Sequence, residues 1–288
     1  DKLKLTVDNQ GSKGWCWAYA SLNSAETNYQ ILTKKEINLA DYHLAYMRIS
    51  ELGGWRNITF ENAASPTAGG NFGDFERYSG IATYYDSDAK ALGPIIGSDD
   101  ENIKYEYSTD IINNMKNRKN EYKVTDVVNF PSINKTYTSD GRVAMYSSEN
   151  KVLTDEQVQF LRNKIKEHIV NYGSLYTVTN IDYDYYNYLT TSLYICSKDV
   201  TLNHAVSIVG WDDNYSKDNF KVGKKPEHDG AYIVQNSWGD YWGNDGYYYV
   251  SYDDALIEKY ISGVICVKQR SQKPNVSIES KSFDTTSN

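Results

Sequence analysis

Three short stretches, far apart in this chain, carry side chains that could together perform acyl-transfer chemistry. They are Gln10-Gly-Ser-Lys-Gly-Trp-Cys16-Trp-Ala, Asn203-His204-Ala-Val-Ser-Ile-Val-Gly210-Trp, and Gln235-Asn236-Ser-Trp238-Gly-Asp-Tyr-Trp242-Gly. A cysteine thiol becomes a strong nucleophile when a base removes its proton, and the base acts best when a third group holds its ring. Cys16, His204 and Asn236 are the residue types that these three tasks require.

Of the four histidines, His204 is the one that lies inside a strand-like apolar run. His43 and His168 fall on helical segments, where a partly exposed histidine is ordinary, and His228 lies in a polar loop. We therefore predict that His204 takes the proton of Cys16 and later protonates the leaving amine.

The order of cysteine, histidine and asparagine, together with the residues that flank them, resembles the papain family of cysteine proteases. Motifs support the resemblance over residues 1–98 and 174–267. It implies an α+β fold of two lobes, one helical and one an antiparallel β-barrel-like lobe, with the active-site cleft between them. It also implies a cysteine endopeptidase that cleaves protein or peptide substrates through a thioester on Cys16 and needs no cofactor.

The same resemblance implies supporting roles around the catalytic residues. Gln10 would form the oxyanion hole together with the backbone N–H of Cys16. Trp238, with Trp242 next to it, would shield the hydrogen bond between the histidine and Asn236 from water. Cys16 would lie at the N-terminus of the long central helix, where the helix dipole favours a thiolate.

Further residues are expected to contact the substrate. Gly69 and Gly70 would offer a bare backbone edge to an extended peptide. Ala205 and Val178 are candidates for the apolar pocket that binds the second side chain before the cut. Trp15 is bulkier than the serine usual beside the nucleophile, and we expect it to narrow the primed side of the cleft.

The chain has three cysteines, and Lys13 stands where the family usually has a structural one. If Cys16 is the nucleophile, Cys196 and Cys266 remain, and their positions relative to His204 and Asn236 imply a disulfide of the family type. Two buried thiols without a bond are the alternative reading.

Composition excludes several classes of protein. The net charge of −8 over 288 residues argues against a nucleic-acid partner, which would require a basic face. No apolar run approaches the ~18–20 residues of a membrane span. No zinc spacing or phosphate-binding loop is present, and Asp212-Asp213-Asn214 is typical of a turn after a strand, so we predict no metal site.

Local patterns predict the order of elements. Helices are expected over 16–32, over 36–51 and after Thr154, which forms a capping box with Gln157 and precedes a C-cap at Gly173. Strands are expected over 174–181, 204–210, 230–236 and 246–252, and Val124–Phe130 could be another.

The domain organisation follows from these elements. We predict one peptidase domain over 1–270, with a helical lobe over about 10–98 and a β-rich lobe over about 151–270 plus 1–9. Because 188 residues separate Cys16 from His204, more than in most members, an insertion is expected over about 99–150. Residues 271–288 form a polar tail or linker.

Two segments indicate a branch of the family. Gly210-Trp-Asp-Asp-Asn-Tyr215 and Gly69-Gly-Asn-Phe are similar to bacterial, especially clostridial, cell-surface members that carry lectin-like or wall-binding domains. This implies a secreted or cell-surface enzyme inhibited by its own pro-segment, and the start at Asp1 fits a trimmed domain. The alternatives are a bleomycin-hydrolase-like aminopeptidase and a non-catalytic cell-surface binding module that retains the fold.

Overall fold

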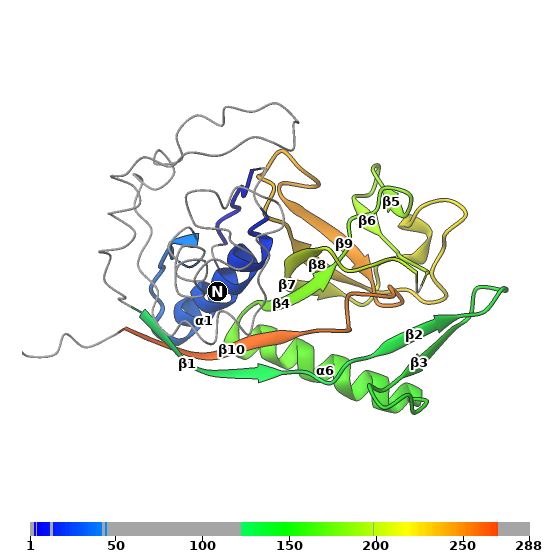
Figure 1. Ribbon diagram of the computed structural model, residues 1–288, viewed down its shortest axis with the longest axis horizontal. Coiled ribbons are helices and arrows are strands. Elements are labelled where there is room, and N and C mark those ends of the chain that lie inside the picture. Colours follow the sequence, from blue (N-terminus) through cyan, green and yellow to red (C-terminus); the bar gives the residue numbers. More distant parts are fainter. Residues whose placement is uncertain are drawn as a thin grey trace, which may run out of the picture.

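The computed structural model of the chain describes residues 3, 5–11, 14–41, 44, 122–197 and 199–269. Within them, an eight-stranded sheet, two long helices and a separate β-hairpin make an α+β fold (Figure 1). The helices are α1 (Cys16–Thr33) and α6 (Asp155–Tyr172). In chain order the strands are β1 (Tyr122–Asn129), β2 (Asn134–Tyr137), β3 (Val143–Tyr146), β4 (Leu175–Thr179), β5 (Tyr186–Asn187), β6 (Ser192–Leu193), β7 (His204–Asp212), β8 (Ala231–Gln235), β9 (Tyr247–Ser251) and β10 (Ser262–Gln269).

The sheet has the order β1-β10-β4-β7-β8-β9-β6-β5, and its neighbours are antiparallel except for the parallel pair β6 and β9. In the described part of the chain its two end strands, β1 and β5, do not pair with each other, so the sheet is open. The α+β class is confirmed. The lobe that was expected to be barrel-like is formed by this open sheet and is not a closed barrel. β7, which begins at His204, and β8, which Asn236 directly follows, are neighbours at the centre of the sheet.

The predicted helix after Thr154 is confirmed as α6, and its ends follow from local sequence. The Thr154 hydroxyl accepts from the N–H of Gln157 at 3.3 Å, and the Gln157 side chain accepts from the N–H of Thr154 at 2.9 Å. At the other end Gly173 has a φ of 109°, and a Cβ there would lie 2.5 Å from the Thr27 hydroxyl of α1. Only glycine fits this turn, which carries the chain from α6 into β4 beside α1.

The four predicted strands in the second half are present as β4, β7, β8 and β9. The strand expected around Val124–Phe130 is also present as β1, which pairs antiparallel with β10 at the end of the sheet. Residues 122–129, which lie within the expected insertion, therefore belong to the sheet. The helix expected over 36–51 falls mostly outside the described residues, and the tail 271–288 falls wholly outside them.

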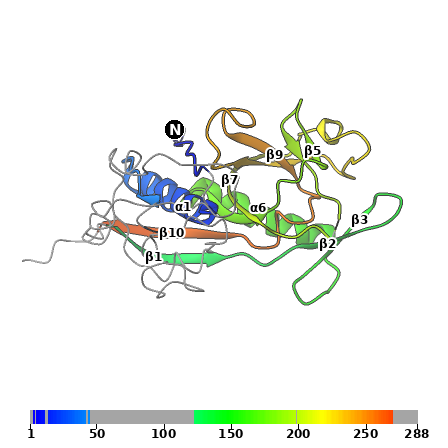
Figure 2. The same ribbon diagram turned by 45° about the horizontal axis from the view of Figure 1, so that its top comes forward.

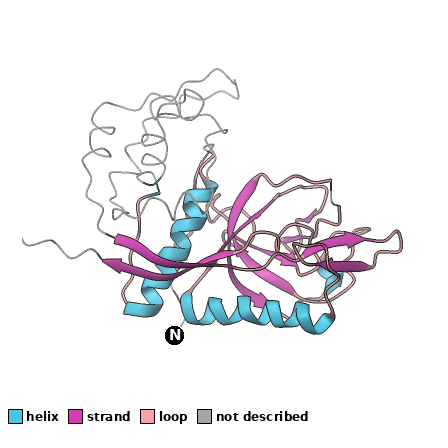
Figure 3. Ribbon diagram, turned by 60° about the horizontal axis from the view of Figure 1, so that its bottom comes forward, coloured by secondary structure: helices cyan, strands magenta, loops and turns pink. Residues whose placement is uncertain are grey.

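Both helices pack against the sheet (Figure 3). Ile165 and Ile169 of α6 lie in the core with Leu175, Val206 and Ile208 of β4 and β7. Helix α1 meets the C-terminal end of α6 (Figure 2) and contacts β7, β10 and β4. The helix that begins at Cys16 is thus seated directly on β7, the strand that begins at His204.

A polar seam fixes how α1 sits on the sheet. The Asn28 side chain is fully buried, donates to the carbonyls of Val264 and Ile265 at 3.1 Å each, and accepts from the N–H of Val267 at 3.0 Å. Ser24 donates to the carbonyl of Ser174 at 2.7 Å. Because buried polar groups are costly when unpaired, these bonds favour a single seating of the helix.

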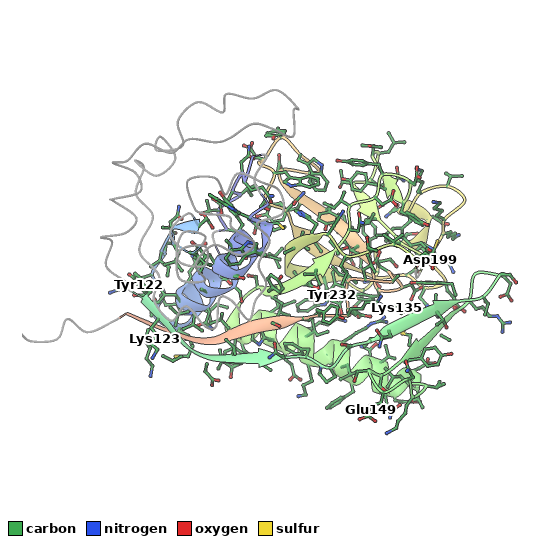
Figure 4. The ribbon with its side chains drawn as sticks, viewed as in Figure 1. Tyr122, Lys123, Lys135, Glu149, Asp199 and Tyr232 are labelled. Carbon is green, nitrogen blue, oxygen red and sulfur yellow. The ribbon has the colours of Figure 1, made fainter. Side chains whose placement is uncertain are left out.

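A buried ion cluster around Glu258, which lies between β9 and β10, joins α6, β2 and β8. The Glu258 carboxylate accepts from Arg162 of α6 at 2.8 Å, from Lys135 of β2 at 2.7 Å and from the Tyr232 hydroxyl of β8 at 2.8 Å. Figure 4 shows Lys135 and Tyr232 in the interior, whereas Glu149 lies at the rim. Two cations acting on one carboxylate lower the pKa of Glu258 to about 2 despite its burial. The cluster ties the β2–β3 hairpin to the sheet.

The disulfide implied by the family resemblance is not formed, because Cys196 and Cys266 are both free. Cys196 follows β6 and packs against a cluster that includes Tyr194 and Phe220, whereas Cys266 lies on β10 opposite Asp126. Four strands separate β6 from β10 in the sheet, at about 4.8 Å per strand. The sequence offsets fitted the family, but the two residues belong to distant parts of the sheet.

Candidate active site

Cys16 is the first residue of α1, as predicted, and Trp15 at the N-cap provides no side-chain cap. The Cys16 sulfur accepts a hydrogen bond from the backbone N–H of Ala205 at 3.3 Å. Ala205 directly follows His204 at the start of β7. The fold therefore brings the predicted nucleophile to the end of the strand that carries the predicted base.

His204 and Asn236 form the second half of the site. The Nε2 of His204 lies 2.7 Å from the Oδ1 of Asn236, and the same oxygen accepts from the N–H of Ser237 at 2.8 Å. The Ser237 contact identifies this atom as the amide oxygen, and an oxygen can only accept. The imidazole must therefore carry its proton on Nε2, which leaves the lone pair on Nδ1 to take a proton from a thiol.

Two tryptophans cover this hydrogen bond. The Trp238 ring lies 4.7 Å from the His204 ring with an interplanar angle of 35°, and the Trp242 ring meets Trp238 edge-on at 5.2 Å. His204 is 8% exposed and Asn236 is 3% exposed. Water has little access to the pair, so its hydrogen bond acts in a low local dielectric.

The N-terminal segment holds Gln10 beside residues 237–239, which directly follow Asn236. Its backbone N–H donates to the carbonyl of Ser237 at 2.8 Å, and the N–H of Gly239 donates to the carbonyl of Asp8 at 2.9 Å. The side-chain oxygen of Gln10 accepts from the Ser237 hydroxyl at 2.6 Å. This bond fixes the orientation of the Gln10 side-chain amide.

Burial governs the protonation of both catalytic groups. It raises the pKa of the Cys16 thiol, and the backbone N–H groups of Ala205, Trp17 and Cys16 itself oppose the rise only in part. It lowers the pKa of His204 to about 4, against the opposing effect of the bond to Asn236. Burial therefore disfavours the thiolate and the imidazolium when either charge forms alone. Moving the proton from sulfur to Nδ1 creates both charges together, so each then stabilises the other.

The other predicted site residues have three different outcomes. Val178 and Ala205 are register partners on β4 and β7, and they pack in the same cluster as Cys16. Gly69 and Gly70 lie outside the described residues. Trp15 was expected on the cleft wall, but it is fully buried and packs in the core around α1, so it is not placed to contact a substrate.

Two residues that support the site were not predicted from the sequence. Ser237 contacts both Asn236 and Gln10. Asn23, two turns into α1, donates to the side chain of Gln235 at 2.9 Å, next to Asn236 in the chain. The position of Ser237 directly after Asn236 was a usable signal, whereas nothing local marks Asn23.

Within the described ranges, no group of three or more histidine, cysteine or acidic side chains is arranged to hold a metal ion. None of the helices in this part of the chain is long and apolar enough to cross a membrane. The described site thus consists of a thiol, an oriented imidazole and nearby amide donors, which is a set suited to acyl transfer.

The fold and this site together define a family. A family model described as papain family cysteine protease matches residues 97–265, which is more than half of the chain and includes His204 and Asn236. The chain therefore belongs to the papain family of cysteine proteases, and the predicted papain-like fold is confirmed.

Relatives match most of this chain but extend beyond it. The viral cathepsin of Cydia pomonella granulosis virus is 24% identical over 270 residues, which are 92% of this chain and 60% of the relative. A cysteine protease of Blomia tropicalis is 25% identical over 255 residues, 86% of this chain and 58% of the relative. The chain thus spans about three fifths of the length of these two relatives.

Solved structures show the same fold. The clostridial cysteine protease Cwp84 after propeptide cleavage is 25% identical, with a TM-score of 0.65 over 93% of this chain and 56% of that one. A structure of the cysteine protease and lectin-like domains of Cwp84, a surface layer associated protein of Clostridium difficile, is 24% identical with the same TM-score. It covers 93% of this chain and 50% of that one. The similarity to clostridial members indicated by the sequence is confirmed at the level of the fold.

Proposed function

We propose that this protein is a cysteine endopeptidase in which Cys16 attacks the peptide bond of a protein substrate and His204 acts as base and acid. The observation that carries the proposal is the 2.7 Å contact between His204 Nε2 and Asn236 Oδ1, since it leaves Nδ1 as the basic atom. The Cys16 sulfur lies against the N–H of the residue next to that histidine. Family membership supports the same reaction.

The reaction follows from these positions. Nδ1 of His204 takes the proton of the thiol, and the sulfur forms a bond to the carbonyl carbon of the substrate. The tetrahedral intermediate collapses when the C–N bond breaks and His204 gives its proton to the departing amine. Water, deprotonated by His204, then attacks the thioester and releases the acid and Cys16.

Gln10 and Cys16 would stabilise the negative oxygen of the intermediate. The backbone N–H of Cys16 is at an open helix N-terminus, and the amide of Gln10 is oriented by Ser237. Donors fixed before the reaction need no reorganisation when the charge appears, which makes them effective in the transition state. Trp238 would shield the hydrogen bond between His204 and Asn236 from water, and Trp242 would support the Trp238 ring from behind.

Substrate contacts belong to the same proposal. Val178 and Ala205, opposite each other on β4 and β7, would line the pocket for the second side chain before the cut. Gly69 and Gly70 would supply the backbone edge. The proposed domain organisation is one peptidase domain over 1–270 followed by a tail over 271–288. Its lobe boundaries are those predicted from the sequence, except that residues 122–129 are part of the sheet and not of the insertion.

A secreted or cell-surface location, an inhibitory pro-segment, and lectin-like or wall-binding partner domains are proposed from similarity to Cwp84. That protein has a propeptide that is cleaved, a lectin-like domain and an association with the surface layer. The relatives are longer than this chain, which leaves room for such segments.

A peptide-library digest tests the proposal. Wild-type protein should cleave internal peptide bonds, and the Cys16→Ala variant should not. Removal of single residues from free N-termini would favour the aminopeptidase alternative. Absence of any cleavage by folded wild-type protein would favour the non-catalytic binding module.

A further inference from the structure

A chain of aromatic rings runs from the catalytic histidine toward the surface. After Trp238 and Trp242, the next ring is Tyr186 of β5, 5.6 Å from Trp242 and 3% exposed. Trp238 covers the hydrogen bond between His204 and Asn236, and Trp242 supports the Trp238 ring. The rings beyond Trp242 have no part in that task.

This chain of rings ends in an exposed pair of tyrosines, Tyr183 just before β5 and Tyr188 in the turn between β5 and β6. Tyr188 lies 5.2 Å from Tyr186, and Tyr183 lies 6.0 Å from it. The two outer rings stack on each other at 5.6 Å with an interplanar angle of 14°, and they are 45% (Tyr183) and 66% (Tyr188) exposed. Leu189, next in the chain, is 95% exposed. Contiguous exposed apolar side chains of this kind mark binding surfaces.

The pair lies near the connection between β8 and β9, which carries Trp238 and Trp242. Tyr186 is 5.6 Å from Trp242, 5.2 Å from Tyr188 and 6.0 Å from Tyr183. Both outer rings therefore lie within about 12 Å of the Trp242 ring, less than four residues of extended chain. Figures 1 and 2 both place the β5–β6 hairpin on the side where the connection from β8 to β9 rises. The exposed tyrosines are thus within reach of Trp242 and connect to it through the buried Tyr186 ring.

We propose that Tyr183, Tyr188 and Leu189 form a docking surface for the part of the polypeptide substrate that follows the cut bond. The inference rests on the proposed peptidase function. His204 gives its proton to the leaving amine, so the chain downstream of the cut starts beside His204 and Trp238. Four ring steps of at most 5.6 Å lead from His204 to Tyr188, a path of about 21 Å that six to seven extended residues span.

The chemistry of the surface favours an aromatic or large aliphatic side chain. The rings lose little rotamer freedom on binding and offer their outer faces and edges to another aromatic group. The stacked rings cover each other's inner faces, so the pair presents no slot between two planes. A peptide already held in the cleft reaches this surface at high effective concentration, and a modest contact suffices to add affinity.

Three peptides and two proteins test the inference. The peptides share one cleavage site and acyl side; one ends three residues after the cut, and two continue for eight. Of the long peptides, one has phenylalanine at the fourth and sixth positions after the cut and the other has serine there. The proteins are wild type and the Tyr183→Ala/Tyr188→Ala variant, with Tyr260→Ala, an exposed tyrosine outside the ring chain, as control.

Wild type should cleave the phenylalanine peptide with a kcat/KM about tenfold above that of the other two, from the energy of one or two aromatic contacts. The double variant should lose this preference and keep its rate on the short peptide, whereas Tyr260→Ala should behave as wild type. Equal rates on all three peptides in wild type would overturn the inference, as would an equal loss on all three in the double variant.

Binding to the Cys16→Ala protein gives a readout that needs no turnover. The eight-residue fragment with phenylalanine should bind this protein, and adding the two tyrosine substitutions should abolish binding. If a soluble oligosaccharide binds at Tyr183 and Tyr188 and the peptide fragment does not, the inference is overturned. If wild type cleaves no peptide, the proposed function fails, and fragment binding alone decides the docking surface.

Discussion

Asn23 of the nucleophile helix donates its side-chain N–H to Gln235, the last residue of β8 and the neighbour of Asn236 in the chain. The oxygen of the Asn23 amide accepts from the hydroxyl of Ser174, so both ends of the group are used. One buried amide thus connects the helix that starts at Cys16 to the strand that ends at the histidine's partner. We infer that Asn23 positions the two halves of the site.

Replacing Asn23 by leucine should therefore affect both stability and turnover. The variant leaves the side-chain oxygen of Gln235 without its buried donor, at about 1–3 kcal/mol for an unsatisfied group, and leaves the Ser174 hydroxyl with Thr27 as its remaining side-chain partner. Turnover should fall with little change in KM, because the substrate does not touch this residue. Urea unfolding and steady-state kinetics measure the two effects, with Asn163→Ala on the exposed face of α6 as control. A variant as stable and active as wild type would show that the bond does not position the site.

The buried cluster at Glu258 makes a second prediction. Glu258→Gln keeps the shape of the side chain but removes the charge between Arg162 and Lys135. Leaving buried cations without their counter-charge should cost about 3–5 kcal/mol in the free energy of unfolding. Glu149→Gln is the matched control, because Glu149 pairs with Lys151 at the surface and both side chains are at least 70% exposed. Equal melting temperatures for the two variants would contradict the account of the cluster.

His168 should make the protein sensitive to acid. Its side chain is 4% exposed between Phe130 and Tyr172, and its Nε2 has no hydrogen-bond partner among the described residues. Burial lowers its pKa from 6.5 to about 4. Between these values the unfolded chain binds a proton that the folded protein does not, so the free energy of unfolding falls as the pH falls.

The contribution of His168 can be read from a comparison of two proteins. From pH 7.5 to pH 5 it should remove about 2 kcal/mol from the stability of wild type. His168→Phe lacks the titrating group, so its stability should fall by that much less over the same range. His204 contributes in the same direction in both proteins and cancels. Parallel pH profiles would show that His168 is protonated in the folded state.

Gln10 should act in the transition state rather than in binding. Gln10→Ala should lower kcat by about 10²-fold or more with a much smaller change in KM, because its donor acts on charge that is absent from the bound substrate. Gln10→Glu is a useful second variant, since it retains the size of the side chain but removes the donor. A raised KM at unchanged kcat in both variants would identify Gln10 as a binding or structural residue.

Much of the sheet, and the segments that bring Cys16, His204 and Asn236 together, could be predicted because their signals are local. Thr154, Gln157 and Gly173 determine the ends of α6 within one stretch, and the motifs around Cys16, His204 and Asn236 each lie within nine residues. What could not be predicted depends on distant contacts, such as the bond between Asn23 and Gln235. His168 is on a helix, as expected, but its burial depends on where β10 passes.

Two further errors have the same origin. Cys196 and Cys266 had the sequence offsets of a family disulfide, but strand order places them far apart. Trp15 was assigned to the cleft from its position beside Cys16, whereas the packing of α1 turns it into the core. In both cases proximity along the chain was a poor guide to proximity in space.

The most direct test of the central claim is the covalent labelling of Cys16. An epoxide-type cysteine-protease inhibitor requires a thiolate and an adjacent acid, which Cys16 and His204 together supply. Peptide mapping by mass spectrometry should find the label on Cys16, with Cys196 and Cys266 unmodified, and the labelled protein should have no peptidase activity. His204→Ala should lose the labelling, since the thiol is then left without its base. Labelling of Cys196 or Cys266 at the rate of Cys16, or peptidase activity that survives full modification of Cys16, would contradict the assignment of Cys16 as the nucleophile.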